Sequence, residues 1–123
     1  MATWTQVKQF LYQNYAVQSD DGDMMTLVIG VTDNRTQLVS VMMGDSIIII
    51  NSPVASVGEV TPERVLAATE GCLLGVKRLA GMYMVSAVAP VEDMNEEELN
   101  TPLLYAALTA DGLERTLGIG DKY

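Results

Sequence analysis

The sequence predicts an α+β domain in which a single antiparallel sheet of about five strands packs against three helices. Three observations support this prediction. Apolar residues recur every three or four positions near both ends of the chain, β-branched runs lie between them, and the connections between those runs are too short for parallel pairing. The expected order is helix, three strands, helix, two strands and helix. A length of 123 residues suits one domain that covers residues 1–123.

The first helix is predicted to begin at Trp4 and to extend to about Tyr15, because large apolar residues recur there at spacings of three and four. Thr3 and Gln6 have the spacing of a capping box, in which side chain and backbone bond reciprocally at a helix start. The next segment, QSDDGD, consists of turn-forming residues and ends the helical pattern.

Three strands are predicted in the segments MMTLVIGVT, QLVSVMMG and SIIIINSPV. The connectors between them are short, so neighbouring strands must be antiparallel. Successive side chains of a strand point to opposite faces of the sheet. The run of isoleucines therefore places Ile47 and Ile49 on one face and Ile48 and Ile50 on the other, and both faces are expected to be apolar.

The second helix is predicted to begin at Pro62, because Thr61 is a favoured N-cap and proline suits the first helical position. Gly71 weakens the helix soon afterwards. Residues 73–80 form either a further strand or a continuation of this helix, since short apolar runs are ambiguous. The segment MYMVSAVAPVE predicts the last strand, after a turn near Gly81.

The last helix is predicted from the segment MNEEEL onward, where Asn95 and Glu98 have the spacing of a second capping box. An apolar stripe then continues toward the end of the chain. Pro102 is expected to kink this helix, or Thr101 to cap a restart at that point. The tail, residues 118–123, is expected to be loose.

The sequence contains few of the residue types and motifs that enzymes and metal-binding proteins use. The chain has no histidine and only one cysteine, Cys72, so Ser-His and Cys-His catalytic pairs and Cys/His zinc sites are excluded. No glycine-rich loop has the spacing of a nucleotide-binding motif. Lys77 and Arg78 are interpreted as the charged outer face of a strand rather than as an anion-binding site. The Asp20–Asp23 loop lacks the further ligands of a calcium site. We expect no enzymatic activity and no cofactor or metal.

The charge balance narrows the range of partners. Sixteen acidic and seven basic residues give a net charge of −9, which repels phosphate groups and makes nucleic acids and anionic membranes poor partners. No apolar run approaches the roughly 20 residues that span a bilayer. The first residues lack the pattern of a secretory signal, and one cysteine cannot form an internal disulfide. We therefore expect a cytoplasmic location.

The doubly apolar strands predict a binding partner. Three short helices suit one face of a five-stranded sheet, and soluble monomers seldom leave a large apolar patch exposed. We expect a homodimer, a protein or peptide client, or both. The alternative, in which loops and the last helix bury both faces within one chain, stays open. The candidate partner-binding residues are Met42, Ile48, Ile50, Leu66 and Leu73.

A competing interpretation is a domain that binds a small ligand in a pocket between the sheet and the helices. Such a site needs convergent polar groups on inward-facing positions, and the sequence identifies none.

Several local matches resemble a known family. The segments RTQLVSVMMGDS and IIIINSPV resemble the R-x-Q-x-V-x-V … I-x-S-P signature of YbjN-type domains, which are relatives of the type III secretion chaperone-like fold. The later segment APVEDMNEEELNTPLLYAALTADGLERTL is similar to that family's last strand and closing helix. The matching positions are Arg35, Gln37, Val39, Val41, Ile50, Ser52, Pro53, Glu98 and Leu99.

This resemblance extends from Trp4 to about Leu117, and the glycine-dotted segment TEGCLLGVKRLAGMY departs from it. It implies the fold of the secretion chaperones and a non-enzymatic domain, often dimeric, that binds other polypeptides in a chaperone-like or regulatory role. It implies no specific client.

Overall fold

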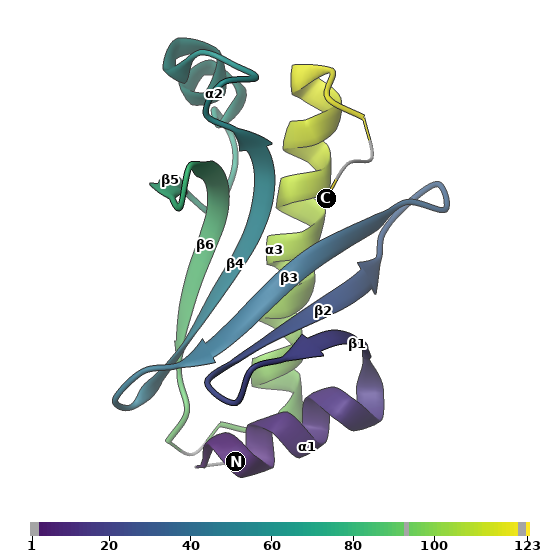
Figure 1. Ribbon diagram of the computed structural model, residues 1–123, viewed down its shortest axis with the longest axis vertical. Helices are drawn as coiled ribbons and strands as arrows, with labels where there is room; N and C mark the ends of the chain where they lie inside the picture. Colours follow the sequence, from purple (N-terminus) through teal and green to yellow (C-terminus); the bar gives the residue numbers. More distant parts are fainter. Residues whose placement is uncertain (1–2, 93, 121–122) are drawn as a thin grey trace.

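The computed structural model describes residues 3–92, 94–120 and 123 (Figure 1). Within these residues it forms one open antiparallel sheet and three helices, which confirms the predicted α+β class. The helices are α1 (Trp4–Asn14), α2 (Pro62–Ala68) and α3 (Glu96–Leu117); the strands are β1 (Ala16–Asp20), β2 (Met24–Gly30), β3 (Thr36–Met43), β4 (Ile47–Ser56), β5 (Val76–Leu79) and β6 (Met82–Pro90).

The sheet has six strands in the order β1-β2-β3-β4-β6-β5, with every neighbouring pair antiparallel. The long helix α3 lies behind the sheet in Figure 1 and packs on β3, β4 and β6. Helices α1 and α2 lie at opposite ends of the molecule, and no helix crosses in front of β3, β4 or β6 in this view. The sheet therefore has one covered face and one open face.

The hydrophobic core lies between the covered face and α3. Every second residue of the central strands is buried there, including Val39, Val41, Ile48 and Ile50, none of which has exposed area. The apolar stripe of α3 meets them with Leu99, Leu103, Ala106, Ala107, Ala110, Leu113 and Leu117. None of the described helices combines the length and apolar composition needed to cross a membrane.

The predicted helix starts agree with the structure. Thr3 and Gln6 form the reciprocal capping box of α1. The hydroxyl of Thr61 accepts a hydrogen bond from the backbone N–H of Arg64 at the start of α2. The side chain of Asn95 accepts one from the backbone N–H of Glu98 at the start of α3. These side chains satisfy backbone donors that the first helical turn leaves without partners.

Strands β1 and β5 are the two strands that the sequence pattern does not clearly predict. Strand β1 was not expected, because its sequence AVQSD is mostly polar and exposed and resembles a turn. It is a strand because Ala16 pairs with Val28 and Asp20 with Met25, which makes it the first half of a hairpin with β2. Within residues 73–80, the strand alternative is correct: α2 ends at Ala68, and β5 pairs with β6.

The end of the chain also differs from the expectation. Helix α3 continues without interruption through Pro102, so no restart occurs at Thr101, because buried leucines on both sides of the proline hold the helix against the core. The tail is not loose where it is described: Ile119 packs against the core, and the Tyr123 hydroxyl donates to Glu59 Oε1 at 2.9 Å. Residues 121 and 122 lie outside the described residues.

A buried carboxylate ties α3 to the β2–β3 hairpin. Asp111 is 3% exposed and accepts from Arg35 Nε at 2.6 Å and from Arg115 Nε at 3.0 Å. Arg115 also pairs with Asp33, an exposed residue of the hairpin turn, at 2.9 Å. Because Asp33 and Asn34 both adopt positive φ, the turn is tight and brings this acid toward α3.

Candidate functional site

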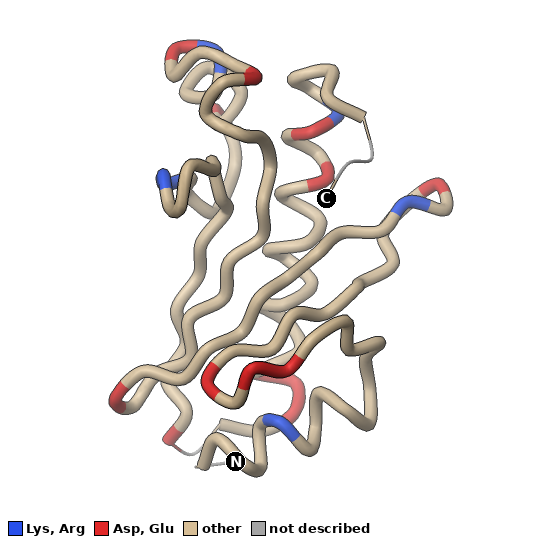
Figure 2. Tube along the Cα trace, in the orientation of Figure 1, with Lys and Arg blue, Asp and Glu red and all other residues tan. Residues whose placement is uncertain are grey.

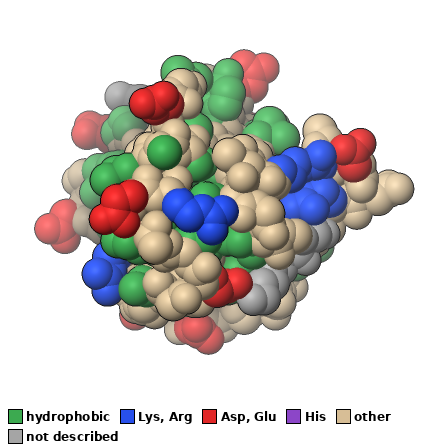
Figure 3. Space-filling view, turned by 90° about the horizontal axis from the view of Figure 1, so that it is seen from above, with side chains coloured by type: hydrophobic (Ala, Val, Ile, Leu, Met, Phe, Trp, Pro, Cys, Tyr) green, Lys and Arg blue, Asp and Glu red, His purple; other side chains and the backbone are tan. Residues whose placement is uncertain are grey.

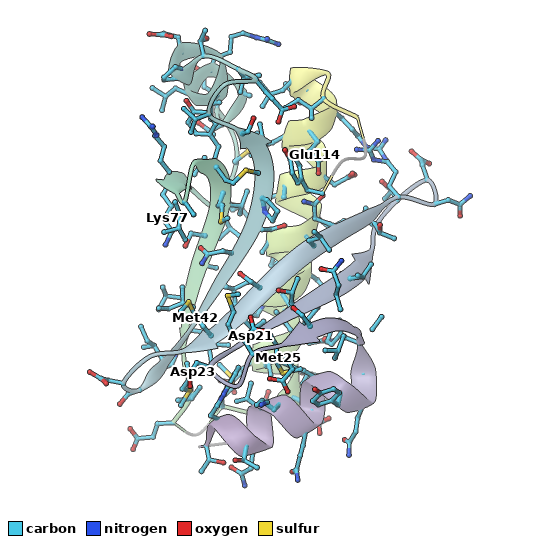
Figure 4. The ribbon with its side chains drawn as sticks, in the orientation of Figure 1. Asp21, Asp23, Met25, Met42, Lys77 and Glu114 are labelled. Atoms are coloured by element: carbon cyan, nitrogen blue, oxygen red, sulfur yellow. The ribbon has the colours of Figure 1, made fainter. Side chains whose placement is uncertain are left out.

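The open face of the sheet carries an apolar row that crosses four strands. The strand register places Met24 opposite Met42, Met42 opposite Ile49, and Ile49 opposite Val88. None of these side chains is fully buried, and Val88 is 60% exposed. This row lies on the surface that the helices leave uncovered, near one end of the strands, where Figure 4 shows Met42.

A polar row runs beside the apolar one. It consists of Thr26, Ser40, Asn51 and Ser86, again opposite one another in β2, β3, β4 and β6. Asn51 is 2% exposed, and no described residue bonds to its Oδ1 atom. Buried amide oxygens normally have a hydrogen-bond partner. The Asn51 oxygen therefore lies beneath the surface of this face without a hydrogen-bond partner among the described residues.

The open face is uncharged. Strands β2, β3, β4 and β6 contain no aspartate, glutamate, lysine or arginine, although the whole chain has a net charge of −9. Figure 2 shows that the charged residues lie in the helices, in the turns and at the sheet margins. A second surface can therefore approach the open face without meeting a charge at its centre.

Three of the predicted partner-binding residues, Met42, Ile48 and Ile50, lie in β3 and β4, and the structure places them on different faces of the sheet. Met42 lies on the open face, as required. Ile48 and Ile50 lie on the covered face with no exposed area, so their assignment to a contact surface is wrong. The reason is that α3 packs on their side of β4. The accessible residues that the prediction missed are Ile49 and Val88, and strand alternation had already placed Ile49 opposite to Ile48 and Ile50.

Leu66 and Leu73, the other two predicted residues, are exposed at 69% and 84%. Leu66 lies on α2 and Leu73 in the connection between α2 and β5, so both are accessible but lie outside the four strands of the open face. The end view in Figure 3, which looks onto the α2 end of the molecule, shows hydrophobic side chains at the surface between isolated charged groups.

A pocket of about 190 Å³ lies between α2 and the β5–β6 hairpin, and we call it the α2–β5 pocket. Its apolar wall consists of Pro62, Val65, Leu66, Val76 and Tyr83. Lys77 and Arg78 also border it, and Figure 4 shows Lys77 at the outer margin of the sheet. This is a small recess with a basic rim, in contrast to the broad and uncharged open face.

A third apolar surface lies on the side of α3 that faces away from the sheet. Leu104, Tyr105 and Leu108 are each 40% exposed or more and border a shallow depression. They form a stripe about one turn long on a helix whose opposite side fills the core. No other element of the described chain covers this stripe.

The acidic β1–β2 hairpin has a structural role. Asp20 accepts from the Tyr12 hydroxyl at 2.7 Å, from the backbone N–H of Gly22 at 2.9 Å and from Lys8 Nζ at 3.0 Å. These contacts, with the Tyr12 hydroxyl first, lower the pKa of Asp20 to about 2. They tie α1 to β1. Among the residues that the structure describes, no three acidic, cysteine or histidine side chains converge as metal ligands.

Comparison with known proteins supports the fold alone. The chain is similar in structure to an uncharacterized protein from Methanothermobacter thermautotrophicus, with a TM-score of 0.55 and 10% sequence identity over 94% of each chain. Neither a family model nor a curated protein matches the sequence.

Proposed function

We propose that this chain is a non-enzymatic, cytoplasmic protein-binding domain that acts as a homodimer, in which a second copy covers the open face. The supporting observation is the apolar row of the open face, which none of the helices among the described residues covers. Its role is that of a chaperone-like or regulatory protein. The chaperone-like or regulatory role is what the resemblance to YbjN-type domains implies, and that resemblance is a prediction from the sequence.

The cost of leaving the open face in water favours a partner. Apolar surface contributes about 25 cal/mol per Å² when it is buried, so a few hundred Å² left wet forfeits several kcal/mol. Soluble monomers seldom expose contiguous apolar patches of this extent.

The size of the open face fits a second copy. Four neighbouring strands about 4.8 Å apart, with about eight residues each at about 3.4 Å per residue, present roughly 500 Å² in outline before side-chain relief is counted. A standard stable interface buries about 800 Å² of accessible surface on each partner. The two areas are of the same order, and twofold homodimers are the commonest oligomers.

The charge and hydrogen-bonding pattern favour self-association over a charged client at this face. Two chains that each carry a net charge of −9 repel one another, and the uncharged centre keeps their charges at the periphery of the contact. The hydroxyls of Thr26, Ser40 and Ser86, which are partly exposed, both donate and accept hydrogen bonds. Such a row can pair with its own copy across a twofold axis. Leu66, Leu73 and the α3 stripe then stay accessible to a client.

The test compares two aspartate substitutions at exposed leucine or valine positions. Val88→Asp places a charge in the apolar row of the open face, and Leu104→Asp places the same charge on the α3 stripe. We expect sedimentation velocity at micromolar concentration to show a dimer for the natural chain and for Leu104→Asp, and a monomer for Val88→Asp. Both positions are at least 40% exposed, so the fold tolerates the charge, and circular dichroism verifies it.

Two results would overturn the proposal. A natural chain that sediments as a monomer over the whole concentration range removes the second copy. A dimer that Leu104→Asp dissociates and Val88→Asp leaves intact moves the contact to α3.

A further inference from the structure

The exposed side of α3 is a continuous band that is longer than its apolar stripe. A helix turns by about 100° per residue, so the exposed residues of α3 between its first turn and Gly112 lie within about 120° of one another on the helix circumference. We call them the α3 band, and its members are Glu97, Glu98, Thr101, Leu104, Tyr105, Leu108 and Gly112. The opposite side of the same helix fills the core.

The α3 band is acidic at its start and apolar in its middle. One shallow depression is bordered by Glu97 and Glu98, and a second by Leu104, Tyr105 and Leu108; Thr101 borders both, so the two parts are contiguous. At Gly112 a side chain would meet no atom within 4 Å, so the band ends on open space. A partner can therefore lie lengthwise along the band.

The two glutamates have no cation within this chain. The ion pairs of the described residues use Lys8, Arg35 and Arg115, and none of them includes Glu97 or Glu98. The helix dipole favours acidic residues in a first turn, but it does not account for exposed leucines and a tyrosine directly after them. The apolar stripe is the feature that calls for a partner, and the two acids indicate the charge of that partner.

We infer that the α3 band docks an amphipathic helix of another protein, which runs antiparallel to α3 and carries lysine or arginine in its last turn. Exposed residues at spacings of three and four form the ridges and grooves into which a second helix packs. Cations are favoured at the end of a helix, and the antiparallel direction places that end beside Glu97 and Glu98. From Glu97 to Leu108 the band is roughly 17 Å long, so about three turns of the partner are in contact.

The charges disfavour two other occupants. The only basic residue of α3 is Arg115, which Asp33 and Asp111 hold at 2.9 and 3.0 Å, so a second copy brings no free cation to the acidic end. It also brings a further net charge of −9. An anionic membrane is repelled by the same two glutamates. The inference rests on the proposed protein-binding function, for which it names a partner, but it uses a surface other than the open face.

The experiment uses a synthetic peptide of about 18 residues, long enough to form an isolated helix. It has leucine at every third or fourth position, alanine and glutamine between them, and lysines in its last turn. We expect saturable binding to the full chain, measured by fluorescence anisotropy of a dye on the peptide. The same peptide with glutamates in place of the lysines should bind about tenfold or more weakly, because its charge repels the acidic end of the band.

NMR of the complex locates the peptide and its direction. We expect amide shifts confined mainly to 96–112. A spin label at the lysine end of the peptide should broaden the amides of 97–101, and a label at the other end those of 108–112. The reverse assignment would contradict the antiparallel direction.

Matched charge variants test the acidic end of the band. Glu97→Gln/Glu98→Gln should weaken the lysine peptide about fivefold, because it removes two surface ion pairs from the complex. The control, Glu63→Gln/Glu70→Gln, removes the same charge from exposed positions on and just after α2. Helix α2 contacts the last turn of α3, where Arg64 Nη2 donates to the Leu117 carbonyl, roughly 30 Å along the helix from Glu97. Screening at that distance should leave the affinity within about twofold.

Two aspartate variants separate this inference from the proposed dimer. Leu104→Asp places a charge in the apolar part of the band and should weaken the peptide about tenfold or more. Val88→Asp, on the open face, should leave the affinity within about twofold, whether or not it changes the sedimentation of the chain. Failure of the dimer therefore leaves the docking measurement intact, and failure of the docking leaves the dimer intact.

Four outcomes would each overturn the inference. The lysine peptide shows no saturable binding; the glutamate peptide binds as tightly as the lysine peptide; or Leu104→Asp and the double glutamine variant of the band both keep the full affinity. In the fourth, Leu104→Asp dissociates an assembly of the natural chain, which shows that a second copy occupies the band.

Discussion

The two faces of the sheet are built from the same strands and both carry large apolar residues, but α3 covers only one of them. On the covered face, Ile48 and Ile50 have no exposed area, because α3 packs against them. On the open face, Ile49 lies between them in the sequence and is only partly buried. Burial in this fold therefore depends on where the helices pack rather than on how apolar a residue is.

The polar groups show the same contrast. The covered side buries a charged network, in which Asp111 pairs with two arginines. The open side buries only the amide of Asn51 and carries no charge in its four central strands. A charged network within one chain is compatible with a fixed intramolecular contact, whereas an uncharged face is compatible with a contact between two acidic chains.

The largest expected difference between the faces comes from two neighbouring isoleucines. Ile50→Ala removes three buried carbons from the covered core and should lower the free energy of unfolding by about 4 kcal/mol. Ile49→Ala changes a partly exposed side chain and should lower it by about 1 kcal/mol. Both are made in the Val88→Asp background, which excludes stabilisation by a second copy, and are measured by urea denaturation with Trp4 fluorescence.

Equal effects of the two substitutions would contradict the assignment of faces. A larger loss for Ile49→Ala than for Ile50→Ala would mean that another part of the chain covers the open face in solution.

The local chemistry of the chain made much of this fold predictable. Capping residues such as Thr3, Thr61 and Asn95 act within one helical turn, so the sequence shows them directly. Strand β1 escaped prediction because its residues are polar and its pairing with β2 is what makes it a strand. An exposed edge strand has no apolar alternation that would reveal it.

The candidate sites depend on contacts that no local pattern contains. Alternation placed Ile48 and Ile49 on opposite faces, but the covered face is chosen by α3, which begins more than forty residues later. Val88 joins the apolar row only through the pairing of β4 with β6. Lys77 and Arg78 were predicted to be a charged strand face, and only the packing of α2 beside β5 places them at a pocket.

An intermediate effect is expected from the buried charge of the covered side. Asp111→Asn leaves Arg35, which is 18% exposed at its side chain, without its carboxylate, and it should lower the free energy of unfolding by about 2 kcal/mol after allowance for partial solvation. The matched control is Asp33→Asn, at a carboxylate that is 75% exposed and at a positive φ that asparagine tolerates; its effect should be about 0.5 kcal/mol or less.

Thermal and urea unfolding of the two asparagine variants measure this difference. Similar small losses for both would show that the Asp111 network contributes little, and that apolar packing alone holds the β2–β3 hairpin against α3.

The smallest expected effect concerns the exposed contacts of Asp20 at the sheet margin, which contrast with the buried contacts of Asp111. The folded pKa of Asp20 is about 2, below its usual value of 3.8, because the Tyr12 hydroxyl, the Gly22 amide and Lys8 favour the charged form. A carboxylate with a lowered folded pKa stabilises the fold above its unfolded pKa, and this contribution is lost as the pH falls from about 4 toward about 2.

Tyr12→Phe removes the first of those three donors and should raise the pKa of Asp20 toward its usual value, as measured by NMR titration of the side-chain carboxyl carbon. The variant then has less stability to lose between pH 4 and pH 2, so its unfolding midpoint should change less over that interval than that of the natural chain. A titration midpoint that does not move would show that the Tyr12 hydroxyl does not set the pKa of Asp20, and that the Gly22 amide and Lys8 favour its charged form without it.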